Sequence, residues 1–176
     1  MDHLWSPWRL EYVTGTKPTG CVFCLRADAP ASAPATAEPV PAPSHDPLVV
    51  FQGRTAYIIL NLYPYNNGHL LVVPYRHEPT LAGLTADEMQ EIGLLTQHAE
   101  TVLRGAYRLE GINVGVNLGR TAGAGIVEHV HVHIVPRWHG DTNFMTVVGQ
   151  TRVLPEELYA TAERLRPLFE RLAHAG

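Results

Sequence analysis

Hydrophobic residues gather in short runs along this chain, and runs of this length bounded by polar and turn residues predict β-strands. The stretches are rich in valine, isoleucine and other residues that suit a pleated sheet, and turns rich in Gly, Pro and Asn separate the first three. The predicted strands cover residues 48–52, 55–60, 69–73, 112–118 and 129–136. We expect the first three to form an antiparallel meander.

A helical spacing follows the third predicted strand. Thr85 and Glu88 form a capping-box pattern, in which each side chain accepts a hydrogen bond from the other residue's backbone N–H. Apolar residues then recur every three or four positions up to about Tyr107, namely Met89, Ile92, Leu95, Ala99, Val102 and Leu103. A second helix is expected over 155–165, with Pro167 interrupting or kinking it. Strands with a long helix on one sheet face predict an α+β domain.

Composition divides the chain into four parts. Residues 27–47 are dominated by Ala and Pro and have few large apolar residues, so we expect a flexible linker or loop. A short helix is predicted over 5–13, with Ser6 as its cap and Pro7 in its first turn. The predicted parts are an N-terminal segment (1–26), the linker (27–47), the main domain (48–150) and a C-terminal helical segment (151–176).

Bulk properties narrow the possible functions. With 176 residues, 45% of them hydrophobic, the chain can bury one sizeable core. A net charge of -4 offers no basic field for long nucleic acid, so a nucleotide-sized ligand is easier to defend. The first 20 residues do not resemble a signal peptide, and no apolar run approaches membrane-spanning length. We therefore expect a soluble, cytoplasmic protein with no membrane partner.

The last predicted strand carries a histidine at every second position. Because side chains alternate across a strand, His129, His131 and His133 are expected to share one surface while the residues between them face a core. A glycine-rich, nearly neutral run over 115–125 comes directly before them, and such a loop can turn backbone N–H groups toward an anion. Imidazoles beside an anion site indicate phosphate chemistry.

The stretch 129–135, read as His-Val-His-Val-His-Ile-Val, resembles the histidine triad (HIT) superfamily of nucleotide hydrolases and transferases. The similarity extends over 60–74, 136–144 and 4–9, which resemble a bacterial branch often assigned to diadenosine tetraphosphate phosphorylases and related to the fragile histidine triad hydrolases. The resemblance implies a five-stranded antiparallel sheet with a long helix packed on it and a C-terminal helix. It also makes the main domain the catalytic domain.

The resemblance assigns catalytic roles to the three histidines. His131 would be the nucleophile that attacks a nucleotide α-phosphorus, since neutral imidazole is both a nucleophile and a fair leaving group. His133 would hydrogen-bond the phosphate or the bridging oxygen as charge develops there, and His129 completes the triad. The competing interpretation is a histidine-rich surface strand with no chemistry.

Substrate contacts are implied in three places. The backbone N–H groups of Gly123, Ala124 and Gly125 would cradle phosphate, with the Asn117 amide near the scissile group. Asn61 resembles a family position that contacts ribose, and His69 one that lies near the phosphate. These positions also suit a plain interstrand turn and ordinary polar residues at strand ends.

Cys21 and Cys24 have the spacing of half a tetrahedral zinc site. The resemblance supplies His77 and His129 as the other two ligands, which would make a closed, structural zinc knuckle and leave catalysis without a metal. A redox pair or two free thiols are the alternatives, although a redox pair usually opens a helix after a strand.

The main functional hypothesis is phosphorolysis of diadenosine tetraphosphate (Ap4A) to ADP and ATP through a nucleotidyl adduct on His131, with inorganic phosphate as co-substrate. Asn117 matches the asparagine that the resembled phosphorylases have at this position. Ala124 and Gly125 occupy the positions where those phosphorylases have Gly-Ser, so a serine hydroxyl that could bind phosphate is missing. An Ap4A or Ap3A hydrolase and an adenosine phosphoramidase are near alternatives.

Two other classes of function stay open. In a metal-dependent phosphohydrolase the triad would bind catalytic zinc with Asp141 as an added ligand; in a nucleotide-binding interaction module there would be little turnover. The segment 138–144 is expected to be a lid, a base-stacking edge or part of a dimer interface. Members of the resembled family also imply a homodimer that pairs through an edge strand or helix.

Overall fold

The computed structural model of the chain describes residues 20–26, 46–141 and 156–174. The helix expected over 5–13, most of the linker, and residues 142–155 lie outside the described residues. The helices are α2 (Val22–Arg26), α3 (Ala86–Ala106) and α5 (Leu158–His174), with single 3-10 turns η1 (Leu81–Gly83) and η2 (Arg120–Ala122). No helix in the described ranges combines the length and apolarity needed to span a membrane.

Five strands form one antiparallel sheet in the order β1-β2-β3-β5-β4. They are β1 (Val49–Gln52), β2 (Ala56–Leu60), β3 (Leu70–Pro74), β4 (Gly111–Val116) and β5 (Val132–Arg137). The first three make the expected meander, and β5 inserts between β3 and β4, so that β4 lies at the sheet edge. The predicted α+β fold with a five-stranded antiparallel sheet is confirmed.

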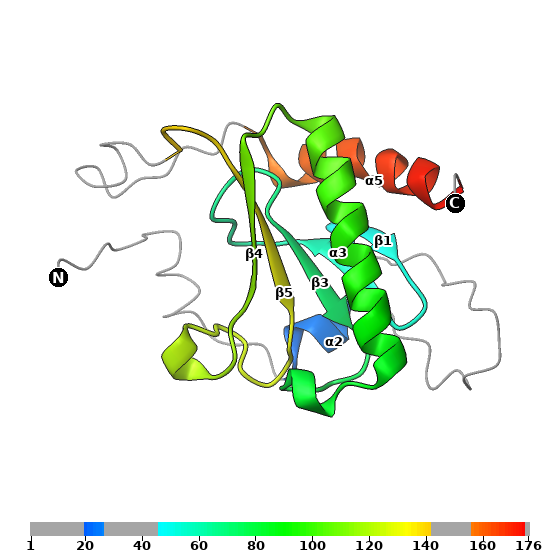
Figure 1. Ribbon diagram of the computed structural model, residues 1–176, viewed down its shortest axis with the longest axis vertical. Coiled ribbons are helices and arrows are strands. Elements are labelled where there is room, and N and C mark those ends of the chain that lie inside the picture. The colour runs from blue at the N-terminus through cyan, green and yellow to red at the C-terminus, as the bar shows by residue number, and fades with distance from the viewer. Residues whose placement is uncertain (1–19, 27–45, 142–155, 175–176) are drawn as a thin grey trace, which may run out of the picture.

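The helix α3 crosses one face of this sheet (Figure 1). Thr85 caps it, and the capping box with Glu88 is present in full, as the sequence pattern predicts. Its inner face buries the predicted apolar stripe against the sheet, except that Met89 is 42% exposed. The buried stripe consists of Ile92, Leu95, Ala99, Val102 and Leu103.

The helix α5 packs against α3 and β1 and runs through Pro167 without interruption. The prediction that Pro167 interrupts the helix is therefore wrong, and the alternative, a kink at Pro167, stays a prediction. Leu165 and Phe169, on either side of it, are almost completely buried in the core. Their packing holds the helix across a position that cannot donate its own backbone hydrogen bond.

The strand β5 begins at Val132, so of the three triad histidines only His133 lies on it. The alternation predicted one strand from residue 129. Instead, the Val130 N–H donates to the carbonyl of Glu78, outside the sheet. Val132 and Ile134 enter the main core as expected. His129 and His131 are buried in the segment that leads into the strand.

Candidate active site

Four metal-ligating side chains gather where α2 approaches the end of β3. The ligand atoms of Cys21, Cys24, His77 and His129 all lie within 4.8 Å of one another. Two thiols and two imidazoles match the donor set of a closed tetrahedral site. Across the described ranges this is the one cluster of three or more such groups, so no grouping of the triad with Asp141 is found there.

The orientation of His129 fits a metal ligand. Its Nε2–H donates to the carbonyl of Pro74 at 2.9 Å, while Nδ1 faces the sulfurs of Cys21 at 3.3 Å and Cys24 at 3.5 Å. A carbonyl acceptor behind a histidine fixes which ring nitrogen can bind the metal. Burial lowers the pKa of His129, so its neutral, ligating form is favoured.

The thiols also fit the cluster. The Nδ1 of His77 lies 3.4 Å from the Cys24 sulfur. Burial, and secondarily the neighbouring Cys21 thiol, raise the pKa of Cys24 to about 11. A bound cation would reverse this preference, because metal ions bind the thiolate form.

His131 is held with one nitrogen engaged. Its Nδ1–H donates to the carbonyl of His129 at 2.8 Å, which leaves the lone pair on Nε2. The residue is buried, and burial lowers its pKa so that the imidazole is neutral near neutral pH. Phe23 from α2 packs on one side of it at a centroid distance of 4.9 Å, and His133 lies on another at 4.8 Å. A neutral imidazole with a fixed tautomer is a competent nucleophile.

A chain of hydrogen bonds sets the tautomer of His133. The backbone N–H of Tyr65 donates to Nδ1 of His69 at 3.0 Å, and a backbone N–H can only donate, so this nitrogen carries no proton. The neutral ring of His69 therefore has its proton on Nε2, which lies 3.0 Å from Nδ1 of His133. His133 accepts this bond and keeps its own proton on Nε2. We call Tyr65, His69 and His133 the histidine relay.

Asn61 joins the relay from the end of β2. Its side-chain oxygen accepts from the Tyr63 N–H at 3.0 Å, which turns its amide nitrogen toward Nδ1 of His69 at 3.2 Å. The structure thus brings Asn61 and His69 together, a contact that the sequence did not predict. Whether Asn61 contacts ribose stays a prediction.

Two backbone N–H groups of the glycine-rich loop between β4 and β5 form hydrogen bonds within the loop itself. The Gly123 N–H donates to Arg120 and the Ala124 N–H to Gly119, and both glycines have positive φ, 88° at Gly123 and 83° at Gly119. These conformations favour glycine because it has no Cβ. Of the three N–H groups expected to cradle phosphate, only that of Gly125 has no hydrogen bond within the described part of the chain.

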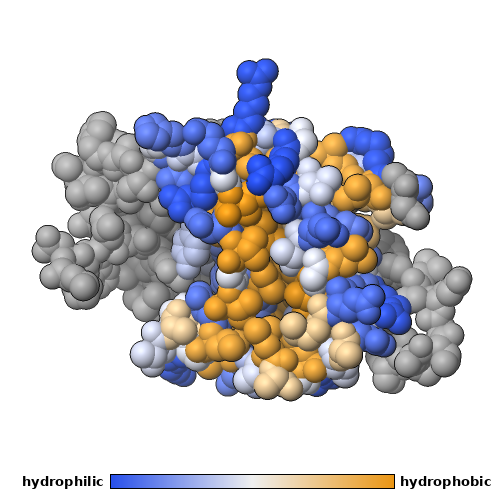
Figure 2. Space-filling view, in the orientation of Figure 1, coloured by the Kyte–Doolittle hydropathy of each residue, from blue (hydrophilic) through white to orange (hydrophobic). Residues whose placement is uncertain are grey.

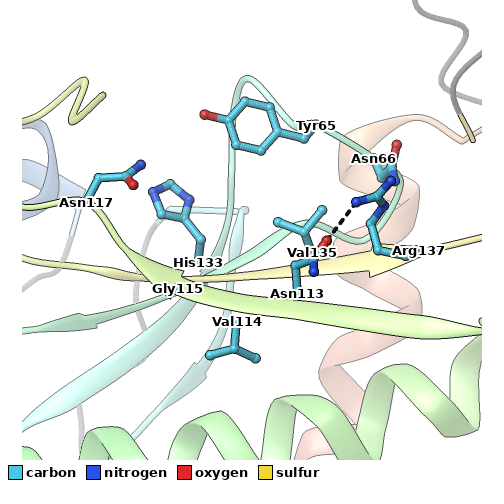
Figure 3. Close-up of a pocket in the computed structure, with 9 residues that line it drawn as sticks. All are labelled: Tyr65, Asn66, Asn113, Val114, Gly115, Asn117, His133, Val135 and Arg137. Carbon is cyan, nitrogen blue, oxygen red and sulfur yellow. Dashed lines mark hydrogen bonds between the residues drawn. The ribbon is translucent and has the colours of Figure 1, made fainter. Parts of the chain in front are cut away.

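A pocket of about 340 Å³ opens beside His133, on the sheet face opposite α3 (Figure 3). Asn117 faces His133 at one end, and Arg137 lies at the other end. Its lining residues come from β4 and the residue after it, from β5 and from the β2–β3 loop: Tyr65, Asn66, Asn113, Val114, Gly115, Asn117, His133, Val135 and Arg137. We call this hollow the β4–β5 pocket. Apart from His133 and Asn117, its residues were not among the sequence candidates.

The far end of the β4–β5 pocket is built around an ion pair. Arg137 donates through Nε and Nη2 to the two carboxylate oxygens of Asp141, and through Nη1 to Oδ1 of Asn113 at 2.7 Å. Asn66 donates to the same carboxylate at 2.8 Å and to the Pro136 carbonyl at 2.9 Å. The Arg137 guanidinium holds the pKa of Asp141 well below its usual range. The Asp141 carboxylate is therefore bound by Arg137 and Asn66, and its position does not require a metal ion.

The comparisons with known proteins agree with the geometry. The HIT domain family model matches residues 43–140, more than half of the chain. The chain belongs to the HIT domain family. The match includes the triad histidines, His69 and the β4–β5 pocket, but not Cys21 and Cys24.

Relatives extend the match beyond the HIT domain. The chain is 42% identical over 175 residues to a Mycobacterium tuberculosis protein named AP-4-A phosphorylase, covering 97% of this chain and 86% of that protein. It is 31% identical over 128 residues to a bis(5'-adenosyl)-triphosphatase of Dictyostelium discoideum, covering 69% and 85% of the two chains. A zinc-bound histidine triad protein of Mycobacterium smegmatis shares the HIT fold, with a TM-score of 0.64, 24% identity, and coverage of 89% of this chain and 97% of that one.

The sequence indicated only partly that the other residues of the β4–β5 pocket line a site. Asn113 and Gly115 lie on the same face of β4, and a polar residue and a glycine at alternate positions of a strand mark a face that does not enter the core. Arg137 lies in the HIT-like motif, but its partners are 4 and 24 residues away. Trp138, expected at a lid or interface, donates through Nε1 to the Arg108 carbonyl at 2.9 Å.

Proposed function

We propose that this chain is a diadenosine tetraphosphate phosphorylase that converts Ap4A and phosphate into ADP and ATP through an adenylyl adduct on His131. The observation that carries the proposal is a buried, neutral His131 with its Nε2 lone pair available, in a chain 42% identical over nearly its whole length to a protein named AP-4-A phosphorylase. The phosphorylase and the triphosphatase relatives differ in product but share adenine dinucleoside polyphosphate substrates by name.

In the first step, Nε2 of His131 attacks the α-phosphorus of one adenylyl group. The P–N bond forms as the P–O bond to the bridging oxygen breaks, and the electron pair leaves with ATP. The Nδ1–H bond to the His129 carbonyl stabilises the positive charge that develops on the ring. The Nε2–H of His133, fixed by the histidine relay, donates to oxygens that gain negative charge.

In the second step, a phosphate oxygen attacks the same phosphorus from the side that ATP has left. The P–N bond breaks, its electron pair returns to His131, and ADP is released. Two displacements at one histidine replace a single reaction between two highly charged anions. Water in place of phosphate would release AMP, which is the hydrolase alternative.

Product analysis decides between these reactions. The purified protein is incubated with Ap4A with and without inorganic phosphate, and the nucleotides are separated by ion exchange. Phosphorolysis predicts ADP and ATP, formed only when phosphate is present. AMP and ATP in both samples would instead identify a hydrolase, and no product in either would overturn the proposal.

We further propose that the four-residue cluster binds a structural zinc ion. Support comes from its two-thiol, two-imidazole donor set and from the His129 orientation toward the sulfurs. Zinc with four protein ligands has no open position, so it would tie the segment at α2 to the sheet and take no part in the reaction. Because His129 precedes His131 by two residues, this tie also steadies the nucleophile.

Metal analysis tests the zinc proposal directly. Protein purified without chelators should contain about one zinc per chain, and Cys24→Ser should lose it together with several kcal/mol of folding free energy, about the scale of structural zinc sites. Thr101→Ser, a similar change on α3 away from the cluster, is the control. Metal-free wild-type protein with unchanged thermal stability would contradict the proposal.

We propose that the protein is a homodimer that pairs through β4 and α3. The strand β4 lies at the sheet edge, and Val114 on its α3 side is 54% exposed. Leu118, two residues after β4, and Leu94 on α3 are 44% and 48% exposed. Figure 2 shows a band of hydrophobic residues down this face of the molecule. An exposed edge strand beside an apolar band is typical of an interface.

Light scattering tests the dimer. Val114→Lys should convert a dimer into a monomer, because a charge on the edge strand opposes pairing. Tyr159→Lys is the matched control, since Tyr159 is equally exposed but lies on α5. A wild-type monomer at micromolar concentration would refute this arrangement.

We also propose a cytoplasmic location. Cys21 and Cys24 are not joined in a disulfide, and cysteines kept reduced for zinc binding suit a reducing compartment. Fractionation of cells should recover the protein with cytoplasmic enzymes; recovery outside the cytoplasm would overturn this.

A further inference from the structure

We propose that the β4–β5 pocket is the subsite for the leaving nucleotide, and that it then receives the attacking inorganic phosphate. This inference rests on the proposed function and adds to it the place where both groups bind. It joins three features of the described residues: the position of the pocket at His133, the ring neighbour of His131, its supply of hydrogen-bond donors, and the open space at Gly115.

Position comes first. In an in-line displacement the leaving group departs from the side of the phosphorus opposite the nucleophile, and the second attacking group enters from that same side. Phe23 closes one side of His131 with an apolar ring, whereas His133 lies 4.8 Å away on another and lines the pocket. A phosphate chain that passes His133 therefore continues into the β4–β5 pocket (Figure 3).

The pocket offers donors to such a chain. None of the nine residues that line the pocket carries a carboxylate, and Arg137 is the positively charged residue among them. Three of the five N–H groups of Arg137 bind Asp141 and Asn113, and the other two have no partner among the described residues, so they can donate to a ligand. The bond from Arg137 occupies the Asn113 oxygen, which leaves the Asn113 amide N–H groups for acceptors. With the Nε2–H of His133, these donors suit phosphate oxygens.

The ion pair keeps this donor set in place. Asp141 holds the guanidinium through two of its nitrogens, so Arg137 does not have to be ordered when a ligand binds. Asn66 holds the Asp141 carboxylate from the β2–β3 loop and is itself buried. The far wall of the pocket is therefore preorganised before a ligand enters.

Space in the pocket depends on Gly115. This residue pairs with His133 across the sheet, and a Cβ added there would meet no atom within 4 Å. A larger side chain would fit the fold, because β-branched residues suit strands, and would project into the pocket beside His133. The absence of a side chain at this position is what leaves room for a phosphate chain.

The Gly115→Val variant distinguishes an effect on binding of the leaving group from an effect on binding of the adenylyl group. Two adenylyl donors are compared: Ap4A, whose leaving group is ATP, and adenosine 5'-phosphorofluoridate, whose leaving group is one fluoride ion. We expect the ratio of kcat/KM for Ap4A to kcat/KM for the fluoridate to fall by about 10- to 100-fold, the scale of a misplaced reacting group. An unchanged ratio overturns the leaving-nucleotide subsite.

The second half of the proposal has its own readout. When the fluoridate forms the adduct on His131 in the presence of phosphate, wild type should release mainly ADP. Gly115→Val should shift the products toward AMP, because water still reaches the adduct while phosphate is hindered. An unchanged ADP share would overturn the phosphate role of the pocket.

Two further variants sharpen the test. Asn113→Asp replaces donors by a carboxylate of the same size and should raise KM for both Ap4A and phosphate. Gly105→Val adds the same side chain as Gly115→Val at a position on α3 with open space, outside the β4–β5 pocket, and should leave both rates and products unchanged. A Gly105→Val variant that lowers the Ap4A-to-fluoridate ratio as much as Gly115→Val does would overturn the assignment to the β4–β5 pocket. A wild type that splits the fluoridate but not Ap4A would refute the proposed function itself.

Discussion

Replacing His69 by phenylalanine tests whether this residue sets the tautomer of His133. The side chain is fully buried, and phenylalanine has a similar volume, so packing is largely kept while both ring nitrogens are removed. The Tyr65 N–H loses its acceptor, which costs about 1–3 kcal/mol when a buried donor is left unpaired. The contacts to Asn61 and His133 add about 1 kcal/mol.

We therefore expect the free energy of unfolding to fall by about 3 kcal/mol, and Tm by about 6–12 °C for a chain of this length. The loss of activity should exceed what stability explains. Without a donor at Nδ1, the ring of His133 can carry its proton on either nitrogen and loses its fixed orientation. Removing one preoriented donor to a developing charge lowers kcat by about 100-fold or more.

Two measurements check this at a temperature where the variant is folded. Single-turnover release of ATP from Ap4A gives the rate, and ¹⁵N spectra of the imidazole rings report which nitrogen of His133 is protonated. His98→Phe on α3 is the control for replacing a histidine by an aromatic ring, since His98 packs near Phe51 away from the relay. The reasoning is refuted if His69→Phe keeps the wild-type rate, or if the rate falls while the His133 proton stays on Nε2.

Three other changes have definite expected outcomes. His131→Asn should abolish turnover, by about 10⁴-fold or more as for other lost nucleophiles, while equilibrium dialysis still detects AMP binding; measurable turnover would exclude His131 as the nucleophile. Asp141→Asn should lower the unfolding free energy by about 1 kcal/mol at neutral pH, since its partner Arg137 is 46% exposed. Folding lowers the pKa of Asp141, so this stabilisation is present above the ordinary aspartate pKa and is lost as pH falls through the lower pKa of the folded protein. The unfolding free energies of wild type and Asp141→Asn, measured by urea titration, should therefore converge in acid. A difference that does not shrink in acid would contradict the assignment of this stabilisation to the Arg137–Asp141 pair. Thr85→Ala removes the cap of α3 and should cost about 1 kcal/mol in the same titration, whereas Thr101→Ala, exposed in the middle of that helix, should not.

Local patterns in the sequence were sufficient for most of the secondary structure. The apolar spacing and capping box after Thr85 define α3 to within one residue, because a helix is specified by contacts three and four positions apart. The strand β5 is shorter than its alternation suggests, since the Val130 N–H binds the Glu78 carbonyl instead of a neighbouring strand. Pro167 stays helical because Leu165 and Phe169 are buried against the rest of the fold.

The sequence by itself determined which residue types are present for chemistry: three alternating histidines, a Gly-His pair and a Cys-x-x-Cys. Only the tertiary structure decided what each can do. Cys21 meets His129 from 108 residues away, and His69 meets His133 from 64 residues away. A hydrogen bond fixes a tautomer only when donor and acceptor are in place, and no periodicity along a chain specifies a partner at that separation. The triad could therefore be recognised from its spacing, whereas the proton on His133 and the open pocket at Gly115 follow from packing.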